Sequence, residues 1–88
     1  MSAIPEITVD ATTGATIAVA SSNDRQEVLM RCRGSARVNL GFNEPALAGA
    51  GIWINPGDGI VIAYPLCQAN IYMVTAGGTS YVGVEAVF

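Results

Sequence analysis

The segment EVLMRCRGSARVNLGF, residues 27–42, contains two runs of alternating residues on either side of a short break. The apolar positions of the two runs are Val28, Met30 and Cys32, followed by Val38, Leu40 and Phe42. A period of two residues is typical of a strand that buries one side and exposes the other. The segment therefore predicts two β-strands, which we take as the centre of the fold.

The break at residues 34–36, Gly-Ser-Ala, determines how these strands would pair in a hairpin. A two-residue loop would place Arg37 opposite Cys32, on the apolar side. A three-residue loop instead pairs Cys32 with Val38, and a shift of one residue would turn every side chain to the opposite face. We therefore predict a hairpin with a three-residue loop, in which Gly34 or a neighbour adopts a positive φ.

In this register Arg31, Arg33 and Arg37 share one face, and Arg25 is the other cation of the chain. One interpretation is a solvated outer face. The other is an interface patch that pairs with carboxylates of a neighbouring chain, because a guanidinium group suits two-point contacts with a carboxylate. Nucleic acid is not expected as a partner, because the net charge is −3 and phosphate binding recruits many cations.

The composition indicates a protein whose surface is partly covered by other proteins. Hydrophobic residues make up 51% of the 88 residues and charged residues 12%, about half of the usual charged share. A lone soluble domain normally carries more charge on its exterior. A single domain of this length is therefore expected either to self-associate or to attach to a larger assembly.

Neither a disulfide framework nor a membrane segment is expected. Cys32 and Cys67 are far apart, and Cys32 falls on the apolar side of its strand, as a small hydrophobe does. The start MSAIPEITVDATTG has neither the basic beginning nor the apolar core of a signal peptide. The longest apolar run, residues 46–54, is short and interrupted by glycine. Synthesis in the cytosol is the resulting expectation.

The remainder of the chain also alternates in short runs. Further strands are expected at residues 7–9, 16–20, 51–55, 59–64, 71–75 and 81–88. Pro56-Gly57-Asp58 is a strong turn signal, interpreted as a hairpin turn, and residues 46–51 (ALAGAG) are interpreted as a flexible loop, with a packing surface as the alternative. Seven or eight short strands predict an all-β, single-domain antiparallel β-sandwich or jelly-roll-like barrel. Residues 1–10 are assigned to an N-terminal arm and first strand, and residues 11–88 to the sandwich.

The chain lacks the residues of common reaction chemistry. Without His, it has neither the usual general base nor the usual metal ligand, and its carboxylates are scattered. We therefore expect no enzyme activity, no cofactor and no metal. The aromatic residues that could stack on a sugar are Trp53, Tyr64, Tyr72 and Tyr81. On strands this apolar, a core or a subunit interface is the stronger expectation for them.

Four stretches together resemble small phage virion proteins of the sandwich type. They are ITV, DRQEVLMRCRGSARVNLGF, GIWINPGDGIVI and ANIYMVTAGGTSYVGV, between Ile7 and Val87. The positions that match this family's pattern are Arg25, Leu40-Gly41, Gly51-Ile52, Pro56-Gly57 and Ile71-Tyr72. The segment MRCRGSAR departs from the polar asparagine that the family usually has there, which leaves the arginine face unassigned.

The resemblance implies a structural protein of the virion, assembled in the host cytoplasm: a capsid decoration or cement protein. It implies a homo-oligomer, with a trimer favoured, that clamps the major capsid protein or another virion protein. Outside contacts are expected from residues 1–9, with Ile4 and Pro5, and from the arginine face, while Trp53 and residues 46–51 are expected near the self-association surface. The alternatives are a head- or tail-fibre component that binds a host glycan through Trp53 or Tyr72, and a subunit of a cytosolic β-assembly.

Overall fold

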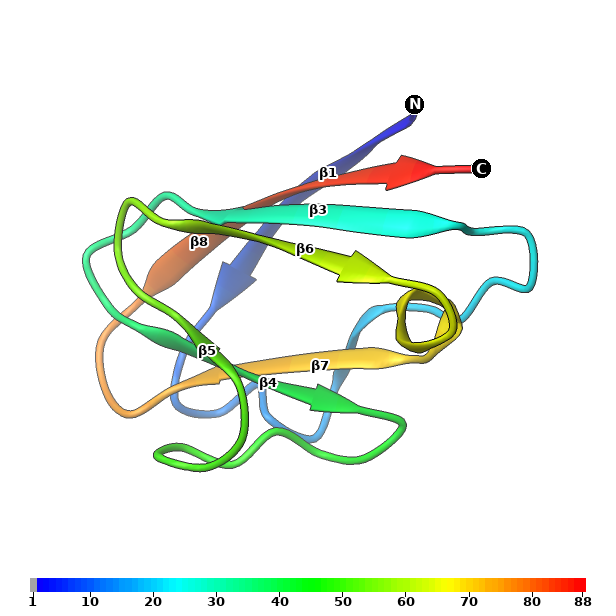
Figure 1. Ribbon diagram of the computed structural model, residues 1–88. Helices are drawn as coiled ribbons and strands as arrows, with labels where there is room; N and C mark the ends of the chain where they lie inside the picture. Colours follow the sequence, from blue (N-terminus) through cyan, green and yellow to red (C-terminus); the bar gives the residue numbers. More distant parts are fainter. Residues whose placement is uncertain (1) are drawn as a thin grey trace.

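The chain folds into two antiparallel sheets packed face to face (Figure 1). The computed structural model describes residues 2–88, which form eight strands and one 3-10 helix. In chain order they are β1 (Ser2–Val9), β2 (Ile17–Val19), β3 (Glu27–Cys32), β4 (Val38–Phe42), β5 (Trp53–Ile54), β6 (Gly59–Ala63), η1 (Leu66–Gln68), β7 (Ile71–Thr75) and β8 (Ser80–Val87). The prediction of an all-β sandwich is confirmed.

The strand order is that of a jelly roll. The first sheet has the order β1-β8-β3-β6 and the second the order β2-β7-β4-β5. Antiparallel partners are therefore β1 with β8, β2 with β7, β3 with β6 and β4 with β5. The chain is one long antiparallel ribbon whose tip is the β4–β5 connection, wrapped so that its two halves form a sandwich. The two termini accordingly lie close together in Figure 1.

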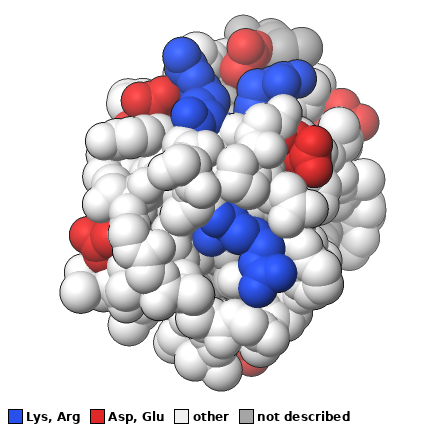
Figure 2. Space-filling view, turned by 90° about the vertical axis from the view of Figure 1, so that its left-hand side faces the viewer, with Lys and Arg blue, Asp and Glu red and all other residues white. Residues whose placement is uncertain are grey.

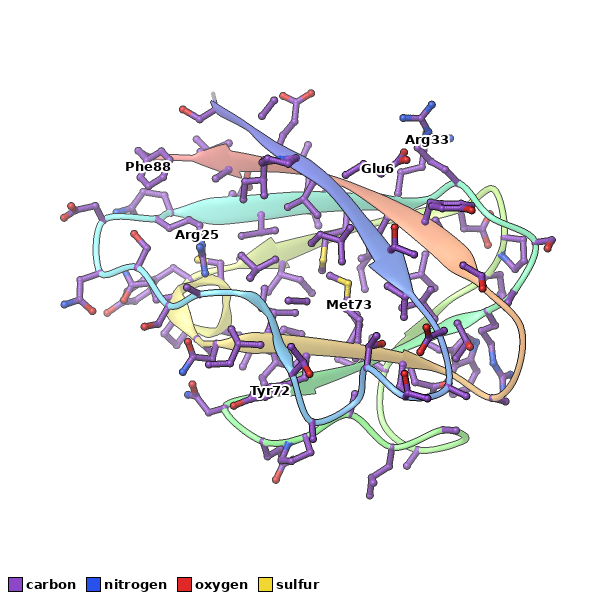
Figure 3. All side chains as sticks on the ribbon, turned by 180° about the vertical axis from the view of Figure 1, so that it is seen from behind. Glu6, Arg25, Arg33, Tyr72, Met73 and Phe88 are labelled. Carbon is purple, nitrogen blue, oxygen red and sulfur yellow. The ribbon has the colours of Figure 1, made fainter. Side chains whose placement is uncertain are left out.

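The core lies between the two sheets, where the alternation turns one side of every long strand inward. Its buried members on the first sheet include Val28, Met30, Cys32, Val82 and Val84, and on the second sheet Val38, Leu40, Ile71 and Met73. In Figure 3, Met73 lies between the sheets. The apolar positions predicted for residues 27–42 are thus core positions.

The predicted hairpin within residues 27–42 is wrong. β3 pairs with β6 and β8, whereas β4 pairs with β5 and β7, so residues 33–37 cross from one sheet to the other. Alternation specifies which side chains face the core but not which strand lies alongside, and here the two apolar sets face each other across the core. Gly34 has no positive φ. A Cβ there would lie 2.6 Å from Ser80 Cα, so this glycine permits a close crossing over the start of β8.

The turn at residues 55–58 is formed as expected, but it does not close a hairpin. The Asp58 N–H donates to Asn55 O at 3.0 Å, and Gly57 has a φ of 84°, as a type II turn requires. The turn nevertheless joins β5 of the second sheet to β6 of the first. Among the strands of residues 2–88, β4 and β5 are the one consecutive pair that shares a sheet.

The β4–β5 connection, residues 43–52, packs on the outer face of the second sheet. The Ala46 N–H donates to Gly14 O at 2.9 Å, and Asn39 Nδ2 donates to Ala50 O at 3.0 Å. A Cβ on Gly41 would collide with Glu44 O and lie 2.9 Å from Ala46 N, so glycine is needed beneath this connection. Within residues 46–51, Ala46 is buried against this face, whereas residues 47–51 are exposed.

The segment expected as an N-terminal arm is a strand over most of its length. Ser2–Val9 form β1, which pairs with β8 at one edge of the first sheet, with a bulge between Ile4 and Ile7. Met1 lies outside the described residues. Since β1 belongs to the sheet, the chain from Ser2 onward is tied down by backbone hydrogen bonds.

Candidate interaction surface

The outer face of the first sheet is poorly covered by the rest of the chain. Residues Glu27, Leu29 and Arg31 of β3 point outward, because their neighbours in the strand are buried in the core. Cross-strand pairs extend this face into rows, and the central row runs Ala3, Glu85, Leu29 and Val61 from β1 to β6. Val61 is 56% exposed. An apolar strip thus reaches the edge of the sheet with only Glu85 interrupting it.

An open hollow of about 810 Å³ lies on this face. Arg31 pairs with Gly59 on one side and with Gly83 on the other, and both glycines line the hollow. Neither glycine has a side chain, and the Arg33 side chain lies over Gly83, where a Cβ would be 3.4 Å from Arg33 Cδ. The guanidinium of Arg31 donates to Gly57 O at 3.2 Å and is otherwise exposed to solvent.

An ion pair bounds one part of the hollow. Arg33 Nη1 lies 3.0 Å from Glu6 Oε2, and Figure 3 shows the two side chains pointing toward each other. Their side chains are 62% and 44% exposed, so the pair contributes only about 0.2–1 kcal/mol to stability. It joins β1 to the segment that leaves β3. Ile4, by contrast, packs against the core, and Pro5 is exposed on β1.

Arg37 and Trp53 form a separate pair. The guanidinium carbon of Arg37 lies 5.0 Å from the centroid of the Trp53 ring, a cation–π distance. Trp53 belongs to β5 of the second sheet. The structure therefore brings Arg31 and Arg33 to the first sheet and Arg37 to the second. The single arginine face expected from the hairpin is not formed. On the face of the molecule shown in Figure 2, the basic side chains lie in separate places and do not form one patch.

Arg25, the cation outside the predicted arginine face, has a structural role. It is 3% exposed, and its guanidinium donates to three carbonyls: Cys67 O at 2.6 Å, Ala20 O at 3.0 Å and Ala69 O at 3.1 Å. Figure 3 shows Arg25 beside the turn of η1. One signal for this role is present in the sequence: Arg25 is a cation that precedes an apolar strand in a chain with few charges.

Trp53 and Tyr72, the two residues named for the alternative of glycan binding, are not neighbours. Tyr72 pairs with Gly41 on β4, and Trp53 pairs with Asn39 on the other side of that strand. Asn39 and Gly41 lie beneath the packed residues 43–52. A continuous aromatic platform is therefore not formed by these two side chains.

The described part of the chain contains neither a metal-binding cluster nor a membrane-spanning helix. Within residues 2–88, no group of three or more His, Cys, Asp or Glu side chains is placed to hold a metal ion. Cys32 and Cys67 are both buried and free. The helix found in this part of the chain, η1, has three residues, and no helix there has the length and apolar character needed to cross a membrane.

Comparisons of the chain with protein-family models, with curated proteins and with solved structures gave no significant match. The case for a function therefore depends on the fold, on the outer face of the first sheet and on the resemblance to phage virion proteins.

Proposed function

We propose that this chain is a structural virion protein that decorates a capsid and stabilises its shell by binding the major capsid protein or another virion protein. The observation that carries the proposal is the outer face of the first sheet, where Val61 is exposed and Leu29 is half-buried beside Arg31. Jelly rolls are common in viral capsid proteins, although the fold alone does not assign a function.

The mechanism is physical and has no catalytic step. A small domain that contacts two or more capsid subunits opposes their separation, because each contact raises the effective concentration of the next. Apolar area removed from water supplies the favourable free energy, and the exposed guanidinium of Arg31 favours a partner that presents carboxylates. A homo-oligomer multiplies these contacts. The proposed location is the virion, with assembly in the host cytoplasm.

The test is retention on particles. Particles assembled with and without this chain are heated, and release of the genome is followed with a dye that fluoresces on DNA. The chain is expected to remain with sedimented particles and to raise the temperature of release. Val61→Glu is expected to reduce retention, whereas Leu47→Glu, on a side chain that is 66% exposed in residues 43–52, serves as the matched control. Equal release with and without the chain would refute the proposal.

A glycan-binding fibre component is the second candidate, and the hollow is the observation that favours it. Open sites with an apolar floor and a few convergent polar groups suit small ligands, and Arg31, Arg33 and Glu85 line this one. The ligand would then lie on the first sheet, not on Trp53 and Tyr72. Binding on a glycan array that is lost in Arg31→Ala and retained in Trp53→Ala would favour this candidate over decoration.

A further inference from the structure

β6 is an edge strand with an open side. It is the last strand of the first sheet and pairs with β3 along one side only. Gly59, Val61 and Ala63 are exposed on the outer face, and Ile60, on the inner side, is partly buried. Unpaired backbone groups on such an edge are a template for pairing with another strand.

The β3–β6 ribbon carries an ordered pattern of charge on its outer face. The register places Glu27 beside Ala63, Leu29 beside Val61 and Arg31 beside Gly59. The three rows are therefore acidic, apolar and basic. The β6 residue is small in the acidic and basic rows, where it is Ala63 and Gly59, and it is Val61 in the apolar row. In a second copy that runs in the opposite direction, the basic row lies opposite the acidic row of the first copy.

We infer that two copies of this chain pair through β6, antiparallel about a two-fold axis at Val61. In this register Val61 of one copy lies beside Val61 of the second copy, and Gly59 lies beside Ala63 of the second copy. The middle of the central row becomes Leu29, Val61, Val61 and Leu29, four apolar residues with Glu85 of each copy beyond them. A two-fold contact of this kind is self-complementary by construction.

The charged rows complete the match. Arg31 of one copy and Glu27 of the second copy fall on the same row, three strand spacings or about 14 Å apart. Between them are Gly59 and Ala63, whose small size leaves room for the two long side chains to lie toward each other. Within residues 2–88 of a single copy, neither Arg31 nor Glu27 takes part in an ion pair. In the dimer, the Arg31 of each copy gains the Glu27 carboxylate of the second copy as a partner.

The inner side of the edge is consistent with the same register. Ile60 is placed beside Ile62 of the second copy, so a partly exposed apolar side chain is covered when the edges meet. β1, at the opposite edge, contains Pro5 and a bulge, two features that discourage strand addition. The geometry therefore selects β6 among the two edges of the first sheet.

The oligomeric state tests the inference. Sedimentation equilibrium between about 10 and 500 μM, a range suited to a contact smaller than standard interfaces, is expected to show a species of twice the 9.1 kDa mass of the chain. Val61→Lys places like charges opposite each other at the axis and is expected to raise the dissociation constant about 100-fold. Leu47→Lys is the matched control. A monomer throughout, a trimer, or a dimer unchanged by Val61→Lys would overturn the inference.

A charge exchange tests the register itself. Arg31→Glu and Glu27→Arg are each expected to raise the dissociation constant about tenfold, and the double variant is expected to restore dimerisation. In one copy these residues are four positions apart on β3, or about 13 Å, so a purely local effect gives no rescue. Circular dichroism confirms that each variant is folded. Failure of the rescue overturns the register, and particle retention, measured separately, reports on the proposed function.

Discussion

Replacing Arg25 by methionine removes the buried guanidinium and keeps an unbranched side chain of similar length. Its three hydrogen bonds go to Cys67 O, Ala20 O and Ala69 O, and the bonds to Cys67 and Ala69 are buried. Each carbonyl left buried without a partner costs about 1–3 kcal/mol. Removing the cation also relieves the cost of its desolvation, which offsets part of this loss. We expect Arg25→Met to lower the free energy of unfolding by about 2–4 kcal/mol.

Such a loss is large for a chain of 88 residues, whose total stability is expected to be about 4–13 kcal/mol. Urea unfolding followed by circular dichroism measures it, at a concentration where every variant has the same oligomeric state. Arg31→Met is the matched control, because it makes the same chemical change at an exposed arginine with one hydrogen bond, and it is expected to stay within about 0.5 kcal/mol. If both variants lower the free energy of unfolding by the same small amount, the hydrogen bonds of Arg25 to the three carbonyls do not hold the β2–β3 connection against η1.

Three further predictions follow from single contacts. Gly34→Ala is expected to destabilise by at least about 2 kcal/mol, because the added Cβ overlaps Ser80, whereas Gly77→Ala, where space is open, changes little; urea unfolding compares them. The Asp10 carboxylate accepts hydrogen bonds from the Thr12 hydroxyl and N–H at 2.6 and 2.7 Å, and these bonds lower the pKa of Asp10 below 3.8. Its small contribution to stability is therefore present above pH 3.8 and is lost as the pH falls through the folded-state pKa. A carbon-detected NMR titration with a midpoint at or above 3.8 would contradict this. Glu6→Gln is expected to cost less than about 1 kcal/mol, because its pair with Arg33 is exposed; a larger loss in the melting curve would show a role beyond that pair.

The sequence was sufficient for the identity of the strands and for most of the core, because burial on one side imposes alternation whichever strand lies alongside. It was not sufficient for the partners. Residues 33–37 and 55–58 carry turn signals that suit a hairpin and a crossing between sheets equally well, and what distinguishes them is long-range pairing with β8 and β6. The prediction that Arg31, Arg33 and Arg37 share one face is wrong for the same reason, because it depended on the hairpin. Arg25 was missed because the carbonyls that bind it come from residues more than forty positions away as well as from nearby Ala20.

The two outer faces of the sandwich differ in how far other parts of the chain lie over them. On the second sheet, residues 43–52 lie across the strands, and Asn39 and Gly41 are buried beneath them although both point away from the core. No comparable segment among residues 2–88 lies over the first sheet, where Leu29 and Val61 are left at least partly exposed. A chain with 12% charged residues has few means of keeping such a face soluble by itself. If another molecule covers the first sheet, as proposed, the edge strand β6 is where that molecule can continue the sheet.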